Sequence, residues 1–357
     1  MKPLLFLAGP RAYKRIREKG LGPDDVRLVL GASGAAKWLG IHGLDVAVFS
    51  DFLTGSSRPV PFFGTSIGAW KLAAATRKDP RAAFDFLAHA YMHQFYKKPV
   101  RRRHVDQEAL RIVDAFLPPG AAREILSHPK FRLHLSVIRC NGALASENAM
   151  ALAWGLGMAF TVNWKGRSQY IRRFDRVIFH DPREESLVNG AFNGASSVPL
   201  TPENFRSALL ATGSIPFLMS GVPEIPGAGE GTFRDGGLVD YHPLPPEELE
   251  EGIVLYPHFY PEVIPGWFDK RMPRRRASAM DLADVLLLAP SSEYVEKLPF
   301  GRIPDRRDFK VFEGNDAARL SFWKKAVAES RRLGDAFLEA LENGRIEDCI
   351  QPMGMDA

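Results

Sequence analysis

A serine lies between two glycines in the segment Gly64-Thr65-Ser66-Ile67-Gly68, directly after the extended apolar run Val60-Pro61-Phe62-Phe63. A serine on a tight strand-to-helix turn needs small neighbours, because the strained backbone packs closely there. The helix expected from Ala69 to Ala75 directs its partial positive N-terminus towards whatever reacts at the hydroxyl. The spacing therefore predicts that Ser66 is a nucleophile in acyl transfer.

Acyl transfer through serine also needs donors for the developing oxyanion. The small-residue turn Gly31-Ala32-Ser33-Gly34 follows the apolar run Val26 to Leu30 and precedes a helical stretch. Small residues leave backbone N–H groups free to converge on an anion at a helix start. We therefore expect the N–H groups of Ala32, Ser33 and Gly34 to bind the oxyanion.

The third requirement is a base that takes the serine proton, and Asp235 is the candidate. Gly236 and Gly237 follow it, which allows a close backbone approach and lets the carboxylate point back into a cleft. An ordinary Asp-Gly turn has the same local pattern. In the catalytic interpretation Asp235 accepts the proton of Ser66 as the hydroxyl attacks an ester carbonyl, and the scheme requires no metal and no cofactor.

These features occur in one order along the chain, and there the sequence resembles the patatin-like phospholipases, serine acyl hydrolases with a Ser–Asp dyad. The resemblance implies that Ser66 is the nucleophile and Asp235 the general base. It also implies a three-layer α/β fold and a phospholipid or other acyl ester as substrate. The matching segments, which contain the supporting glycines Gly31, Gly64, Gly68, Gly236 and Gly237, are Leu28 to Gly34, Gly64 to Ala69, Ala211 to Phe217 and Asp235 to Val239.

One segment departs from the family pattern. The oxyanion loop of the family usually reads Gly-Gly-Gly-x-Lys/Arg-Gly, whereas Ala32-Ser33-Gly34 occupies the triplet in this chain. The basic residue, Lys37, comes one position late. The identity of the oxyanion donors therefore depends on the backbone conformation of this turn.

The elements that must position these residues follow from the apolar pattern. Strands alternate with helices, which predicts a mostly parallel sheet with helices on both faces. Asp79 to Tyr96, with Asp79-Pro80 as its start, and Asp316 to Leu341 have apolar residues at helical spacing. The strand-like runs are Val26 to Leu30, Val60 to Phe63, Arg132 to Arg139, Arg176 to Phe179, Thr232 to Arg234, Gly252 to Tyr256 and Val285 to Leu288.

The chain has 357 residues, enough for one large domain. We expect an N-terminal extension over residues 1–25, the acyl hydrolase domain over 26–315 and a C-terminal helix over 316–357 packed on that domain. The longest apolar stretch, Ala149 to Val162, is shorter than a membrane span and is interpreted as a buried helix. Trp154 in this stretch and Trp164 just after it are expected in the core, in an acyl pocket or at a membrane.

Composition narrows the compartment and the partners. Hydrophobic residues at 45% and charged residues at 25% are typical of globular proteins, and the net charge of +5 favours anionic partners. Cys140 and Cys349 lie far apart without metal-ligand spacing, which indicates a reducing compartment. We expect a cytoplasmic protein with transient contact to anionic membranes. The basic runs Arg101 to Arg103 and Arg274 to Arg276 are solvated loops or headgroup contacts; they lack the interleaved aromatic residues typical of nucleic-acid binding.

Three other functions share some of these signals. An α/β-hydrolase would use His242 or His258 in a Ser–Asp–His triad. A dinucleotide-binding oxidoreductase would use the turn at Gly31 to Gly34 with Asp51 about twenty residues later. A non-catalytic lipid-binding protein could use the same fold without hydrolysis.

Overall fold

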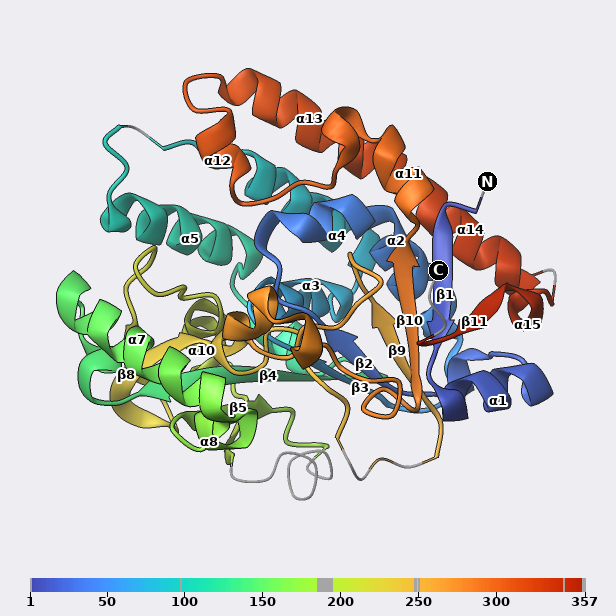
Figure 1. Cartoon of the computed structure of the whole chain (residues 1–357), viewed down its shortest axis with the longest axis horizontal. Helices are drawn as coiled ribbons and strands as arrows, with labels where there is room; N and C mark the ends of the chain where they lie inside the picture. The colour runs from blue at the N-terminus through green and yellow to red at the C-terminus, as the bar shows by residue number, and fades with distance from the viewer. Residues whose placement is uncertain are drawn as a thin grey trace.

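A mixed, mostly parallel β-sheet lies at the centre of the computed structural model (Figure 1). The structure describes residues 2–96, 98–184, 195–246, 249, 251–342 and 344–354. The strand order is β11-β1-β10-β9-β2-β3-β4-β5-β6; in addition β8 pairs with β4, and β7 pairs with β8. The strands are β1 Leu4–Ala8, β2 Val26–Gly31, β3 Val60–Gly64, β4 Phe131–Cys140, β5 Asp175–His180, β6 Ser196–Pro199, β7 Val222–Ile225, β8 Gly229–Asp235, β9 Ile253–Pro257, β10 Val285–Pro290 and β11 Ile350–Pro352.

The parallel part of the sheet brings the predicted motifs to one edge. Strands β10, β9, β2, β3 and β4 pair in parallel, and Gly31 of β2 is in register with Gly64 of β3. The carboxyl ends of β2 and β3 therefore lie side by side, so the turn after Gly31 and the turn that carries Ser66 are neighbours. Each of the seven predicted strand-like runs forms a strand, which confirms the mostly parallel α/β arrangement.

Helices surround the sheet, and the predicted start of one of them is confirmed. The side chain of Asp79 accepts a hydrogen bond of 3.0 Å from the N–H of Ala82 and so caps α4. The helices used below are α1 Pro10–Lys19, α2 His42–Val46, α3 Ile67–Ala75, α4 Pro80–Met92, α5 Arg102–Phe116, α6 Ala121–Leu126, α7 Ala149–Lys165, α8 Arg167–Ile171, α10 Phe205–Thr212, α11 Ser292–Lys297, α12 Asp308–Val311, α13 Asp316–Glu329, α14 Arg331–Glu342 and α15 Ile346–Cys349.

Strand β4 shows how the sheet separates two cores. Leu135 and Val137 belong to the main core, which α3, α4 and α10 cover, whereas Ile138 and Cys140 belong to a second core. Successive side chains of a strand point to opposite faces, so these cores lie on opposite sides of the sheet. Helices α7 and α8 cover the second core, with Leu156 among its buried members. The result is the expected three-layer arrangement (Figure 1).

The two ends of the chain pair with one another and with the central sheet. Within the expected extension over residues 1–25, Leu4–Ala8 form β1 inside the sheet, between β11 and β10. Phe6 is buried there. Pairing within the sheet stabilises this short apolar run. Ile350–Pro352 add the edge strand β11, and both ends of the chain meet on this side (Figure 1).

The predicted long C-terminal helix is divided into α13 and α14 at Ser330. The Ser330 hydroxyl accepts a hydrogen bond of 2.8 Å from the N–H of Gly43. A Cβ on Gly334 would lie 2.5 Å from the carbonyl oxygen of Gly43, so α14 packs directly against α2.

The apolar stretch Ala149 to Val162 forms a helix, α7, but only one of its faces is buried. Leu152 and Leu156 pack on the second core, while Trp154 and Trp164 are 69% and 61% exposed. The expectation of a buried helix is therefore wrong for the outer face. Among the residues that the structure describes, no helix has the length and apolarity needed to cross a membrane.

Candidate active site

Ser66 occupies a strained turn between β3 and α3. Its backbone has φ 52° and ψ −132°, a conformation in which a side chain on an L-residue is uncommon. The N–H of Ser66 donates to Oγ1 of Thr212 at 2.9 Å, and that hydroxyl donates to the carbonyl oxygen of Ser136 at 2.7 Å. Thr212 thus links the strained turn to β4 and holds the Ser66 hydroxyl in place.

The flanking glycines allow α3 to begin directly on the end of β2. A Cβ on Gly68 would lie 2.2 Å from the carbonyl oxygen of Gly31, and one on Gly31 would lie 2.8 Å from that of Gly68. A Cβ on Gly64 would lie 2.8 Å from the backbone nitrogen of Ala69. Close backbone approach, rather than an unusual φ, is therefore the reason for glycine at these positions.

The hydroxyl of Ser66 donates a hydrogen bond of 2.8 Å to Oδ2 of Asp235. The other carboxylate oxygen, Oδ1, accepts from the N–H of Gly237 at 2.7 Å. The N–H of Asp235 donates to the carbonyl oxygen of Ser214 at 3.1 Å. Both oxygens and the backbone of Asp235 are therefore fixed, and the carboxylate is aimed at the serine hydroxyl.

Strand β8 brings this aspartate to the serine. Asp235 is its last residue and is in antiparallel register with Val137 of β4. A Cβ on Gly236 would lie 2.2 Å from the carbonyl oxygen of Ser136, so only glycine fits where the chain turns away from β4. A Cβ on Gly237 would lie 2.6 Å from Oγ of Ser33, so the loop after Asp235 packs on the turn after β2.

The surroundings of Asp235 change its acidity. Burial raises the pKa of its carboxyl to about 6, against the opposing effect of the hydrogen bonds from Gly237 and Ser66. The positive charges of Lys270 and Arg306 also act to lower it. The group is therefore ionised at neutral pH and is a stronger proton acceptor than a solvent-exposed aspartate.

The turn after β2 differs in detail from the predicted donor set. The N–H of Ser33 donates to the carbonyl oxygen of Tyr241 at 2.8 Å and is therefore not free for an oxyanion. Ala32 is buried beside Gly68. The N–H of Gly34 and that of the next residue, Ala35, have no acceptor among the residues described.

Ala35 was missed by sequence reasoning. Two cavities adjoin Ser66, and Ala35 lines both of them. Its backbone φ is 50°, which is rare for a residue with a side chain. Its sequence position, just after the small-residue triplet, carries no separate signal. Gly34 also lines one of these cavities, so two adjacent residues of this turn share a cavity with the serine.

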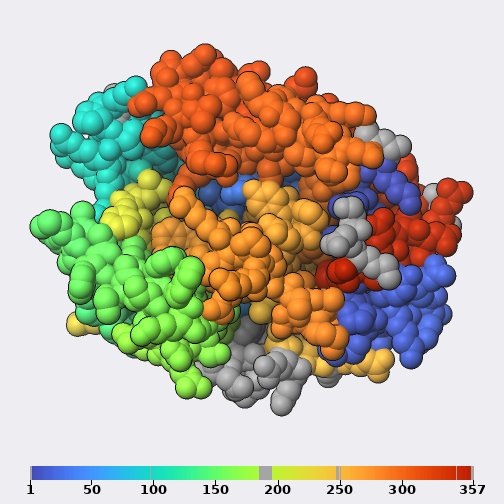
Figure 2. Space-filling model, in the orientation of Figure 1, coloured from blue at the N-terminus to red at the C-terminus, as the bar shows by residue number. Residues whose placement is uncertain are grey.

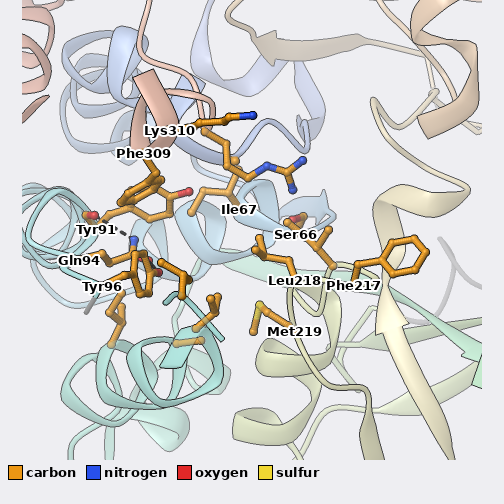
Figure 3. Close-up of a pocket in the computed structure, with 18 of the residues that line it drawn as sticks. Ser66, Ile67, Tyr91, Gln94, Tyr96, Phe217, Leu218, Met219, Phe309 and Lys310 are labelled. Carbon is orange, nitrogen blue, oxygen red and sulfur yellow. Dashed lines mark hydrogen bonds between the residues drawn. The ribbon is translucent and has the colours of Figure 1, made fainter. Parts of the chain in front are cut away.

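An apolar cavity of about 570 Å³ extends from Ser66 between α3, α5 and the segment around α12. Figure 3 shows Ser66 near its centre, with Tyr91, Tyr96 and Phe309 at the end away from Phe217. Tyr96 donates to Oε1 of Gln94 at 2.6 Å, which satisfies two polar groups at that end. Apolar residues that line the cavity include Ile67, Trp70, Val105, Ala109, Ile112 and Met219, and charged residues such as Lys98, Lys310 and Glu313 line other parts of it.

A second cavity, of about 630 Å³, adjoins Ser66 and Asp235 and is polar. Lys37 lies in it and forms an ion pair of 2.8 Å with Asp305. The ammonium group of Lys270 lies 3.8 Å from the centre of the Tyr241 ring. The cationic residues of this cavity are Lys37, Lys270, Arg271, Arg276, Arg306 and Arg307.

The histidines proposed for a triad lie elsewhere. His242 Nδ1 and His258 Nε2 are 3.1 Å apart and are hydrogen-bonded to one another. Both rings are buried, and burial lowers the pKa of His258 to about 3 and that of His242 well below its usual value. Their hydrogen-bond partners in the described structure do not include Ser66 or Asp235. A catalytic triad is therefore contradicted by the geometry.

Asp51, the acidic residue of the dinucleotide-binding alternative, forms an ion pair of 2.9 Å with Arg81 at the surface. It lies in a helical segment after Ala47, not at the end of a second strand, which is where a ribose-binding carboxylate is placed. The dinucleotide-binding alternative therefore lacks a ribose-binding carboxylate at the end of a second strand.

Comparison with known proteins adds one finding. The model of the family described as patatin-like phospholipase matches residues 29–246 of the chain. This range is more than half of the sequence, and it contains Ser66, Asp235 and the turn between β2 and α3. No curated protein matches the chain.

Proposed function

The chain belongs to the patatin-like phospholipase family, and on that premise we propose that it hydrolyses fatty acyl esters through an acyl intermediate on Ser66. Asp235 is the general base in this proposal. The observation that carries it is the buried hydrogen bond of 2.8 Å between the Ser66 hydroxyl and Oδ2 of Asp235. A weakly nucleophilic hydroxyl becomes reactive when an adjacent base accepts its proton.

The proposed reaction has two steps. The oxygen of Ser66 attacks the ester carbonyl while Asp235 takes the hydroxyl proton, and the tetrahedral intermediate expels the alcohol, which leaves with that proton. Water then attacks the acyl-serine, again with Asp235 as base, and releases the fatty acid. A pKa of about 6 supports this role, because the carboxylate is ionised at neutral pH yet basic enough to accept a proton.

The N–H groups of Gly34 and Ala35 are our proposed oxyanion donors. Both line a cavity with Ser66, and neither has an acceptor among the described residues. The N-terminus of α3, which begins at Ile67, adds partial positive charge beside the serine. The oxyanion would thus meet fixed dipoles that need no reorganisation during the reaction.

The two cavities support an ester that has an apolar chain and an anionic headgroup. The apolar cavity starts at Ser66 and suits the acyl chain. The polar cavity starts at the same residue and has basic side chains, Lys270 and Arg306 among them, which suit a phosphate. A phospholipid is therefore our proposed substrate class, and the enzyme class is carboxylic ester hydrolase. We further propose that the protein acts in the cytoplasm at membrane surfaces.

A fluorophosphonate probe tests the nucleophile directly. We expect the probe to label the wild-type protein on Ser66, and we expect Ser66→Ala to lose labelling and hydrolysis of p-nitrophenyl esters and phospholipids alike. A non-catalytic lipid-binding protein would take no label and release no fatty acid. Labelling of a different residue, or full hydrolysis by Ser66→Ala, would overturn the proposal.

A further inference from the structure

Helix α7 presents an apolar face to solvent. Met150, Trp154 and Met158 recur every four residues along it and are exposed, as are Phe160 and Trp164. Helical residues four apart lie on one side, so these side chains form a stripe along most of the helix. Exposed apolar patches of this kind mark sites that bind another molecule or a membrane.

The opposite side of α7 already has its partner within the protein. Leu152, Leu156 and Ala159 are buried against the second core. The N–H groups at the start of the helix are capped by Asn148, whose side chain accepts from the N–H of Met150 at 2.9 Å. The helix is therefore firmly held, and its tryptophans are exposed because of their position rather than because of fraying.

The charged residues next to the stripe that have no ion pair in the described structure are basic. Residues 149–165 include no aspartate or glutamate, and Lys165 ends the helix. Arg172 and Arg173 follow after α8, and they are exposed without an ion pair in the described structure. Glu147, just before α7, is neutralised by ion pairs with Arg102 and Arg234.

The segment Ile264–Arg276, which we call the strap, lies beside α7 and extends the basic border. Asn163 of α7 donates to Asp269 of the strap at 2.8 Å, and Arg275 donates to the carbonyl oxygen of Asn163 at 3.2 Å. In Figure 2 the green α7 and α8 and the orange strap form adjoining parts of one face. The strap residues Arg271 and Arg274 are exposed there, without an ion pair in the part of the chain that the structure describes.

The strap also connects the stripe to the entrance of the cavities. The ring of Phe160 lies 5.6 Å from that of Phe268, which lies 5.4 Å from that of Trp267. Trp267 lines both cavities that adjoin Ser66. A chain of ring contacts therefore runs from the stripe on α7 to the cavities that adjoin Ser66.

We propose that the outer face of α7 docks the protein on an anionic lipid bilayer, with Trp154 and Trp164 inserted at the level of the headgroups. Tryptophan is preferred at this depth because its ring is apolar and its N–H is polar. The surrounding lysine and arginine side chains add attraction to anionic lipids. A second copy of the chain would bring the same unpaired positive charges together, so charge complementarity favours the bilayer. The proposal concerns binding alone and stands whether or not the protein is a hydrolase.

Vesicle flotation tests this binding with hydrolysis removed. The parent protein carries Ser66→Ala, so that lipids stay intact, and the vesicles contain phosphatidylcholine with phosphatidylglycerol. The test variant adds Trp154→Ala and Trp164→Ala. The control instead adds Met280→Ala, which removes an equally exposed apolar side chain that lies outside α7 and the strap. Thermal unfolding of each protein checks that the fold is intact.

We expect the parent and the Met280→Ala control to float with the vesicles. We expect the double tryptophan variant to bind at least about tenfold more weakly than the parent. Binding of the parent should weaken on vesicles of phosphatidylcholine alone. Equal binding of the double tryptophan variant and the parent would overturn the proposal. A parent that fails to bind vesicles would also overturn the proposal. This includes a parent that binds no vesicles but forms a dimer through the tryptophans in sedimentation without lipid. Wild-type protein that binds the vesicles but releases no fatty acid would instead contradict the hydrolase proposal alone.

Discussion

The hydroxyl of Ser66 donates a hydrogen bond of 2.8 Å to Oδ2 of Asp235, a residue 169 positions later in the chain. Ser66 follows β3 and Asp235 ends β8, and both strands pair with the same edge of β4, opposite β5. Each residue is held by its own backbone contacts. Ser66 is fixed through Thr212, and Asp235 through Gly237 and Ser214. The relationship therefore needs no histidine to orient or complete it.

Replacing Asp235 by Asn should separate activity from stability. We expect kcat/KM to fall by about 10²- to 10⁴-fold, because an amide cannot accept the Ser66 proton. In the folded protein the carboxyl binds its proton more tightly than in the unfolded chain. Its contribution to stability is thus present below pH 3.8 and is lost as pH rises through about 6. At pH above 7, in steady-state kinetics and thermal unfolding, the variant should be inactive but at least as stable as the wild type.

The matched control is Asp51→Asn, which removes a carboxylate from a surface ion pair with Arg81. Such pairs contribute about 0–1 kcal/mol, so stability and activity should both stay near the wild-type values. Asp235→Asn with wild-type kinetics would show that the base lies elsewhere.

The pH dependence of the reaction should report the same carboxyl group. Because the base must be ionised, we expect kcat/KM to rise with pH and to level off above about 6, the pKa of Asp235. His258→Gln should keep this profile, since that histidine is buried against His242 and has a pKa of about 3. A profile that His258→Gln shifts or abolishes would instead support a histidine base.

Adding one methyl group at Gly68 should disturb the site. The Cβ of Gly68→Ala would lie 2.2 Å from the carbonyl oxygen of Gly31, so α3 or the turn after β2 must move. We expect a loss of stability of about 1–3 kcal/mol by denaturant unfolding, with a large loss of kcat. Gly157→Ala is the comparison, because its Cβ would meet nothing within 4 Å on α7. That variant should be as stable as the wild type or slightly more stable.

Thr212 should act as a positioning residue. Thr212→Val keeps the shape but removes the acceptor for the Ser66 N–H and the donor to Ser136. A buried N–H without an acceptor costs about 1–3 kcal/mol, and the strained turn should relax away from Asp235. We expect a lower kcat with little change in KM, and recovery in Thr212→Ser. If Thr212→Ser failed to recover activity, the hydroxyl would not be the relevant group.

Lys270 tests the proposed headgroup cavity. Lys270→Met removes an amine that lies over the Tyr241 ring and near Asp235, and burial lowers the pKa of this amine to about 7. We expect about a tenfold loss of kcat/KM for phospholipids, and a much smaller loss for a neutral p-nitrophenyl ester of the same acyl chain. Equal losses for both substrates would show that Lys270 does not distinguish the headgroup.

The chemistry-bearing motifs were predictable because their signals are local. Ser66 and Asp235 each lie between or beside glycines, at the end of a recognisable strand. Thr212 lay within a predicted motif, but its role depends on contacts with β4 and the serine turn. Ala35 depends on a positive φ that its residue type does not favour. Such roles follow from tertiary packing and have no local pattern.

Two features of the fold could not be predicted from the sequence, for the same kind of reason. Leu4–Ala8 is too short an apolar run to be distinguished from other segments until its pairing with β10 is known. The sequence of α7 is apolar on every side, and such a pattern is typical of a buried helix. The exposure of Trp154 and Trp164 can therefore be recognised only when it is known which face of α7 packs on the second core.

The most direct test of the account is to detect the acyl group on the enzyme itself. Wild-type protein is mixed with a p-nitrophenyl ester, quenched with acid during turnover and digested for mass spectrometry. We expect the acyl mass on the peptide that contains Ser66, and we expect neither adduct nor turnover in Ser66→Ala. Turnover without an adduct on Ser66, together with full activity in Ser66→Ala, would contradict the central claim.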